Sequence, residues 1–307
     1  MTSFQQCWPR PVAYLFLALG FMLPATAGER SPMEFGVCFH HGAFGDEYTP
    51  AAASVLDDLR SAGRFWIRGD FQDPAKDAPF AADMERKGIQ VLALLPWYST
   101  DTSEWPTYVK NQVQATPAVP AWEITNEPEM TWWGGPIPAA TYMRMLREAH
   151  GIIKAANRDA RVVGPAVGAN PEGVAYLESL IEMGLLEFVD AISVHYYVYH
   201  QNMLLEEVKR IVAGRKPIWI TETGWTTADQ EGGEKAQQTY IQSHYDLNSG
   251  ILGADPAVEV IFNYELNDER YPALPGEDDG WGLTYGPEGG FRKKAAYHEF
   301  KKLLARD

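Results

Sequence analysis

Short apolar segments alternate with amphipathic segments along the chain from residue 34 to its end. Each apolar segment is rich in Val, Ile or aromatic side chains and lacks the polar/apolar alternation of a half-exposed strand. This composition is typical of strands buried on both faces of a parallel sheet. The predicted strands are 34–39, 65–68, 90–95, 122–125, 161–164, 191–195, 218–221 and 259–264.

The segments between these strands have apolar residues at helical spacing. Gly63, Gly88 and Gly214 fit helix C-termini, and Pro50 and Pro79 fit first-turn positions. The predicted helices are 51–63, 79–88, 107–116, 139–157, 173–184, 203–214, 234–250 and 293–305.

Strands that are each followed by a helix, in eight evenly spaced units, predict an α/β fold with a single (β/α)8 TIM barrel. A doubly wound open sheet is the alternative, and the absence of a Gly-rich phosphate loop after the first strand disfavours it. The sequence contains no obvious linker, so we expect residues 28–307 to form one domain. Cys38 is the only cysteine of this domain, lies in an apolar strand and is expected to be a buried structural thiol.

The first 27 residues have the pattern of a signal peptide. Arg10 precedes the apolar run 12–23, and Ala25 and Ala27 give a small-x-small cleavage pattern. We therefore expect a secreted or periplasmic protein that is cleaved after Ala27. The run is too short for a comfortable membrane span, and no later segment is long enough.

The chain is acidic, with a formal net charge of −15. Loss of residues 1–27, which contain Arg10 and no acid, would make the charge one unit more negative. Nucleic acid is therefore not expected as a partner, because binding a polyanion needs clustered Lys and Arg. We expect no cofactor and no metal, since no His-Glu-x-x-His motif or cysteine cluster occurs. The acidic loop 276–280 could hold calcium, but such loops are usually only solvated. The sequence gives no indication of oligomeric state.

Polar residues follow the predicted strands at the end where TIM barrels carry their chemistry. Glu127 and Glu222 belong to units three apart, which places them across the barrel mouth from each other. Glycoside hydrolysis requires two carboxylates that flank the bond to be cut. The other strand-end residues selected as candidates for the site are His40, Arg68, Trp97, Asn126, His195, Tyr197 and Trp225.

The motifs around these two glutamates resemble those of clan A retaining glycosidases. "WEITNEP" (122–128) and "PIWITETGW" (217–225) carry the resemblance, together with "DAISVHYY" (190–197). The stretch 126–165 is most similar to glycoside hydrolase family 39 and to neighbouring endo-acting groups. Family 39 enzymes usually carry an extra β-sandwich, whereas here a bare barrel is expected.

This resemblance implies a retaining β-glycosidase acting on a poly- or oligosaccharide, and the similarity to endo-acting groups favours internal cleavage. Glu127 would be the acid/base, Glu222 the nucleophile, and Trp281 the aromatic platform under the sugar. Asn126 is expected to donate to the sugar 2-hydroxyl. A non-catalytic carbohydrate-binding barrel and a transglycosidase that uses the same residues are the alternatives.

The remaining candidates have more general roles. Arg68 is expected to pair with Glu222, Tyr197 to hydrogen-bond the nucleophile or the ring oxygen, and His195 to line the wall near Glu127. His40 would contact substrate or cap its strand. Tryptophans in strand-end loops suggest several sugar subsites, because sugars pack their C–H faces on aromatic rings. These are Trp97, Trp132, Trp133 and Trp225.

Overall fold

The computed structural model describes residues 33–42, 48–130, 136–198, 203–228, 232–268 and 280–306. The predicted signal segment lies outside the described residues. So do Trp132, Trp133 and residues 276–279 of the acidic loop.

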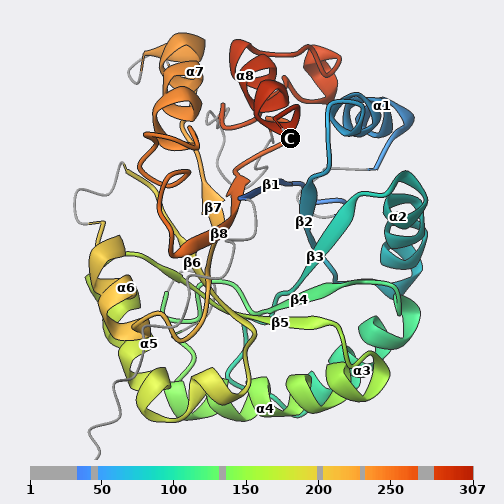
Figure 1. The fold of residues 1–307 in the computed structure, drawn as a ribbon. Helices are drawn as coiled ribbons and strands as arrows, with labels where there is room; N and C mark the ends of the chain where they lie inside the picture. Colours follow the sequence, from blue (N-terminus) through green and yellow to red (C-terminus); the bar gives the residue numbers. More distant parts are fainter. Residues whose placement is uncertain are drawn as a thin grey trace, which may run out of the picture. The chain divides into compact units, whose positions relative to one another are not determined.

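Eight parallel strands form a closed barrel in the order of the sequence, each paired with its neighbours in the chain and β1 paired with β8 (Figure 1). The single (β/α)8 prediction is therefore confirmed, and the open-sheet alternative is wrong. The strands are β1 (Glu34–Cys38), β2 (Trp66–Asp70), β3 (Gln90–Leu95), β4 (Ala121–Ile124), β5 (Arg161–Gly168), β6 (Ala191–His195), β7 (Ile218–Thr223) and β8 (Val258–Asn263).

A helix follows each strand and lies outside the ring of strands (Figure 1). Pro79 was predicted to lie in the first turn of its helix, but it lies inside α2. The helix begins earlier because Asp73 caps its first turn and Pro74 occupies the first helical position. The helices are α1 (Pro50–Arg60), α2 (Pro74–Lys87), α3 (Trp105–Ala115), α4 (Ala139–Ala156), α5 (Pro171–Glu182), α6 (Leu205–Val212), α7 (Gly233–His244) and α8 (Ala295–Leu304).

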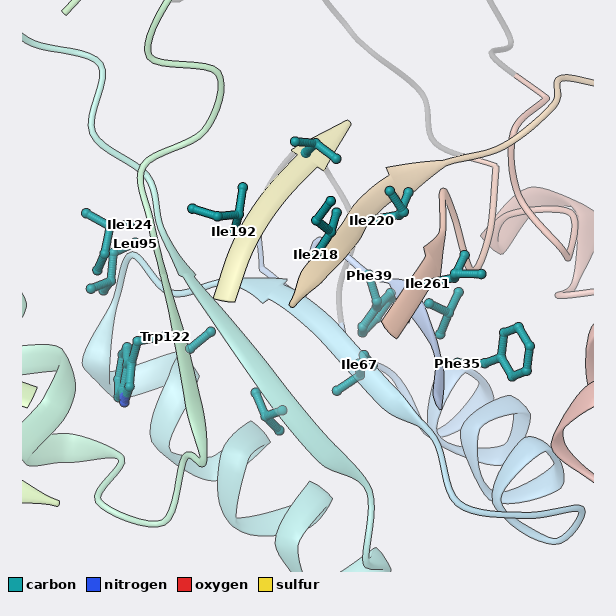
Figure 2. Packing of buried hydrophobic residues seen from close by; sticks show 14 of the residues in the cluster. Phe35, Phe39, Ile67, Leu95, Trp122, Ile124, Ile192, Ile218, Ile220 and Ile261 are labelled. Atoms are coloured by element: carbon teal, nitrogen blue, oxygen red, sulfur yellow. The ribbon is translucent and has the colours of Figure 1, made fainter. Parts of the chain in front are cut away.

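Buried apolar side chains form two separate layers. The larger layer fills the space between strands and helices, where Ile67, Ile220 and Ile261 point outward from the barrel (Figure 2). The smaller layer fills the barrel interior with Trp66, Trp219 and Phe262, among others. Full burial of each large side chain stabilises the fold by roughly 1.5–3 kcal/mol, so both layers contribute substantially.

Close packing inside the barrel explains two features of β1. A Cβ atom at Gly36 would lie 2.4 Å from the Phe262 ring, so only glycine fits there. Cys38 is buried as predicted, and its thiol donates to the carbonyl of Thr221 at 3.4 Å. Burial raises the pKa of this thiol, although the positive charge of Arg68 opposes the shift. The raised pKa disfavours the reactive thiolate.

Within the described residues, no helix has the length and hydropathy needed to cross a membrane.

Candidate active site

The chain turns sharply after β4, and this turn carries the first of the two glutamates. Thr125 and Glu127 have φ values of 61° and 44°, a left-handed conformation that is uncommon for residues with side chains. The Glu127 N–H donates to the carbonyl of Ala166 at 3.1 Å, which ties the turn to β5. Such backbone strain is concentrated at functional sites, where the surrounding structure maintains it.

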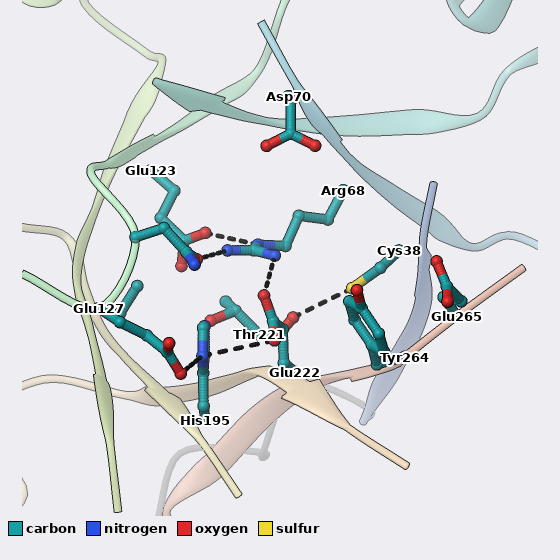
Figure 3. A network of polar contacts seen from close by, with 12 residues as sticks. Cys38, Arg68, Asp70, Glu123, Glu127, His195, Thr221, Glu222, Tyr264 and Glu265 are labelled. Atoms are coloured by element: carbon teal, nitrogen blue, oxygen red, sulfur yellow. Dashed lines mark hydrogen bonds and ion pairs between the residues drawn. The ribbon is translucent and has the colours of Figure 1, made fainter. Parts of the chain in front are cut away.

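Both predicted catalytic glutamates contact the same histidine nitrogen. His195 Nδ1 lies 2.9 Å from Glu127 Oε1 and 3.5 Å from Glu222 Oε2 (Figure 3). The Tyr197 hydroxyl donates to Glu222 Oε2 at 2.8 Å. The ends of β4, β6 and β7 therefore bring these four residues together, as expected from their positions in the sequence.

Arg68 lies at the centre of the polar network and contacts three side chains (Figure 3). Its Nη1 donates to Glu222 Oε1 at 2.6 Å, and its Nε donates to Glu123 Oε2 at 2.6 Å. Its Nη2 donates to Asn126 Oδ1 at 2.7 Å. Because a guanidinium only donates, the amide oxygen of Asn126 must face it, which leaves the amide NH₂ available to another acceptor.

The charges around Glu222 keep it ionised. Burial alone would raise the pKa of Glu222, but His195, Arg68 and the Tyr197 hydroxyl outweigh burial and lower it. For His195, burial would lower the pKa, but Glu222 and Glu127 raise it above its usual range. The site therefore combines an ionised carboxylate with a second carboxylate in a different environment, an arrangement suited to acid–base and nucleophilic chemistry.

A second polar group lines the mouth between β1, β2 and β8. His40 pairs with Asp70 through Nδ1, and its Nε2 lies 3.3 Å from the Tyr264 hydroxyl. Glu265 Oε2 lies 3.9 Å from the same nitrogen. Burial would raise the pKa of Asp70, but His40 and Arg68 lower it. His40 thus takes part in a side-chain network at the barrel mouth and does more than end its strand.

The three described tryptophan candidates have different surroundings. Trp281 packs edge-on against Tyr197, with ring centroids 5.3 Å apart, and so adjoins the predicted catalytic pair. Trp97 packs instead on α3, at 5.6 Å from Trp105. Trp225 packs on Tyr240 of α7, at 5.8 Å. Trp281 is therefore joined to the carboxylate network through its contact with Tyr197.

The backbone at Trp281 is held by a buried glutamine that the sequence did not single out. The side-chain amide of Gln237 on α7 lies within 3.4, 3.0 and 3.1 Å of the carbonyl oxygens of Gly280, Trp281 and Gly282. Lys294, which is fully buried, donates to the same Gly280 carbonyl at 3.1 Å. These donors fix the segment from which the Trp281 ring projects.

Replacing Gln237 by Met should loosen this segment while keeping the side-chain volume. For the predicted glycosidase activity we expect KM to rise by about tenfold with a smaller change in kcat, because stacking of substrate on Trp281 weakens more than the chemistry. The measurement is steady-state hydrolysis. Gln238→Met is the matched control, since Gln238 bonds Glu299 instead and should leave KM unchanged. Equal KM values in the two variants would contradict this role for Gln237.

Two acids near the site, one fully buried and one partly buried, were not predicted to have a role. Glu123 lies in β4 and is fully buried against Arg68. Glu129 accepts a hydrogen bond from the Gly168 N–H at 2.7 Å, which links the β4 turn to the end of β5. A charged residue within an apolar strand was the available signal for Glu123. Nothing in the sequence marks Glu129 as more than a turn residue.

Burial raises the pKa of Glu129 to about 7, although the Gly168 N–H opposes the shift. The pKa of an unfolded glutamate is about 4.3, so the folded chain binds this proton more tightly than the unfolded chain. Between about pH 4.3 and pH 7 the free energy of unfolding therefore falls as the pH rises. Glu129→Gln should remove this fall. We expect the variant to be more stable than wild type by roughly 1–3 kcal/mol above pH 7 and nearly equal near pH 4. Denaturant unfolding at both pH values measures this, with the exposed Glu85→Gln as control. A difference that does not change with pH would contradict the interpretation.

No group of three or more His, Cys, Asp or Glu side chains suited to a metal occurs among the described residues.

Comparison with known proteins agrees with this geometry. Residues 97–249, which include both glutamates, match the family model of the glycosyl hydrolase catalytic core. A search of curated proteins found no match. The matched core and the barrel define the class of the protein, which is that of the glycoside hydrolases.

Several solved structures share the fold. A glycoside hydrolase family 39 β-xylosidase from Caulobacter crescentus is 16% identical, with a TM-score of 0.66 over 92% of this chain and 73% of its own. A family 39 enzyme from Xanthomonas axonopodis pv. citri is 17% identical, with a TM-score of 0.64 over 92% and 68%. β-Glucuronidase 2 from Bacteroides uniformis, covalently bound to cyclophellitol-6-carboxylate aziridine, is 14% identical, with a TM-score of 0.65 over 91% and 36%. At these identities the likeness establishes the common barrel.

Proposed function

We propose that the protein is a retaining β-glycosidase that hydrolyses internal O-glycosidic bonds of a poly- or oligosaccharide. The observation that carries the proposal is the position of His195 Nδ1, 2.9 Å from Glu127 and 3.5 Å from Glu222. The nearest oxygens of the two carboxylates must be closer than these two contacts combined. That limit accords with a retaining pair, whose carboxyl groups lie about 5–5.5 Å apart, and disfavours the wide end of the inverting range of about 6.5–9.5 Å.

In the first step, protonated Glu127 gives its proton to the leaving glycosidic oxygen while ionised Glu222 attacks the anomeric carbon. The bond to the leaving group breaks and a glycosyl–Glu222 ester forms. Glu127, now ionised, then takes a proton from water. The resulting attack on the anomeric carbon releases Glu222 and the sugar with its original configuration.

The surrounding residues support these roles. Arg68 and Tyr197 each hold one oxygen of Glu222, which orients the carboxylate for attack. The Asn126 NH₂, left available by the contact of its oxygen with Arg68, would donate to the sugar 2-hydroxyl. Such a bond strengthens as the sugar ring flattens in the transition state. Trp281 would stack on the sugar face.

Export also belongs to the proposal and rests on the N-terminal sequence. The charged, apolar and small-residue pattern of residues 1–27 supports a secreted or periplasmic enzyme. Its substrate would then be an extracellular or periplasmic glycan, which suits internal cleavage of a polymer. Amino-terminal sequencing of the exported protein should find residue 28 first, and an intact Met1 would contradict export by this route.

The deciding experiment is digestion of a panel of polysaccharides by wild type and Glu222→Gln. We expect wild type to release oligosaccharides from the polymer interior, and proton NMR to detect the β-anomer first. The variant should release nothing. An α-anomer formed first would contradict retention, and glycan binding without cleavage by wild type would favour the non-catalytic barrel. Products longer than the substrate would identify a transglycosidase.

A further inference from the structure

The charges at the barrel mouth bear on the kind of sugar that the site accepts. The described contacts gather five carboxylates there: Asp70, Glu123, Glu127, Glu222 and Glu265. The same contacts bring only one arginine and two histidines to this group. Figure 3 shows the carboxylates from several strands pointing toward the same central region.

Each of these basic side chains is already engaged with a carboxylate. Arg68 is 2% exposed and donates to two glutamates at 2.6 Å. His195 lies between the two predicted catalytic glutamates. His40 pairs with Asp70. An anionic group on the substrate would therefore find no uncommitted cation in this network.

The wall formed by His40, Asp70, Tyr264 and Glu265 adjoins the catalytic pair. His40 is among the charges that lower the pKa of Glu222. Tyr264 packs edge-on against Tyr197 at 6.2 Å and Trp281 at 6.3 Å, so this wall and the aromatic platform border the same space. Carboxylate, imidazole and phenol groups exchange hydrogen bonds with sugar hydroxyls, whereas buried carboxylates repel a uronate carboxylate.

Acidic residues also outnumber basic ones in the sequence of the segments between residues 33 and 306 that lie outside the described residues. Segments 43–47, 131–135, 199–202, 229–231 and 269–279 contain eight acidic residues, one arginine and one histidine. Their sequences therefore supply Arg270 as the single permanently charged cation.

We propose that the site accepts a neutral sugar between Glu127 and Glu222 and discriminates against uronic acids. This inference rests on the proposed glycosidase function. A uronate would lose its hydration on entering a group of carboxylates whose guanidinium is already shared, and no new ion pair would compensate the loss. The neutral sugar instead presents hydroxyls to the same acceptors.

Matched polymer pairs test the inference. Neutral β-glucan, β-mannan and β-galactan are each compared with the same polymer after oxidation of its C6 hydroxyls to carboxylates, and xylan is included as a further neutral substrate. We expect kcat/KM for the cleaved neutral polymer to exceed that for its oxidised partner by at least about 100-fold. Cleavage of any oxidised polymer at or above the rate of its neutral partner overturns the inference but leaves the glycosidase proposal intact.

A pair of covalent probes gives an independent readout. Cyclophellitol aziridine and its 6-carboxylate are compared for labelling of Glu222, detected by peptide mass spectrometry. The neutral probe should label faster, and preferential labelling by the 6-carboxylate counts against the inference. A protein that neither cleaves any polymer nor reacts with either probe contradicts the proposed function itself, and with it this inference.

Variants test the electrostatic cause. Glu265→Gln and Asp70→Asn each remove one negative charge from the wall with little change in shape. In each variant the ratio of kcat/KM for the neutral polymer to kcat/KM for its oxidised partner should fall by about tenfold. Glu85→Gln, on the exposed face of α2, should leave this ratio unchanged. An unchanged ratio in both folded wall variants, checked by thermal unfolding, contradicts the assigned role of these carboxylates.

Discussion

Replacing Glu222 by glutamine is expected to lower kcat by about 10⁴-fold or more, which corresponds to roughly 5 kcal/mol of barrier. The amide cannot form the glycosyl ester, because it is a much weaker nucleophile than the carboxylate. The fold should persist, since an amide oxygen can still accept from Arg68. The measurement is kcat on the best polysaccharide of the panel, with thermal unfolding to confirm the fold.

A variant with a smaller side chain at position 222 distinguishes loss of the nucleophile from loss of the folded structure. In Glu222→Ala the space left by the carboxylate should admit azide, which attacks the anomeric carbon directly and gives the α-glycosyl azide from an activated β-glycoside. Azide should therefore restore cleavage by Glu222→Ala, whereas it should not accelerate cleavage by wild type. A residual kcat within tenfold of wild type in Glu222→Gln would exclude Glu222 as the nucleophile.

The second large effect is expected at Arg68. Arg68→Met should destabilise the fold by roughly 3–5 kcal/mol, because it leaves the fully buried Glu123 without its ion-pair partner. It should also lower kcat by at least about 100-fold, because Glu222 and Asn126 lose the donor that orients them. Denaturant unfolding and steady-state hydrolysis measure the two effects.

A double variant distinguishes these two consequences. Arg68→Met combined with Glu123→Gln removes the buried charge together with its partner, so it should recover about half or more of the lost stability. Activity should not recover, since the contact with Glu222 remains absent. Recovery of activity in the double variant, or a stability loss below about 1 kcal/mol in Arg68→Met, would contradict the role described for this guanidinium.

Sequence periodicity was sufficient for the order and type of the elements, but less so for their ends. The predicted fifth strand stops at Gly164, whereas β5 continues to Gly168. Glycine and proline at 164 and 165 normally interrupt a strand, but here the ladder passes them with a register shift between Pro165 and Val167. The left-handed conformation of Ala166 accompanies this irregularity. Pairing with β6, which continues to Gly168, outweighs the local preference.

The candidate site could be predicted residue by residue but not as a network. Strand-end position identified Arg68 and Glu222, although they are 154 residues apart in the chain. The sharing of one guanidinium among Glu222, Glu123 and Asn126 depends on which strand faces point inward at a given height of the barrel. That height is set by the stagger of a closed sheet, which a single sequence does not reveal. The catalytic roles themselves remain predictions until the variants are measured.

The aromatic layer below the polar network affects how substrate and products reach and leave the site. Trp66, Trp219 and Phe262 occupy the barrel interior beneath the predicted catalytic carboxylates, and the Trp219 indole N–H donates a hydrogen bond to Glu259 at the opposite end. We therefore expect ligands to enter and leave by the mouth. In the proposed reaction the departing half of the glycan must clear this single entrance before a water molecule can reach the ester. The lifetime of the ester, and the share of it captured by another sugar instead of water, would then depend on how quickly that half departs.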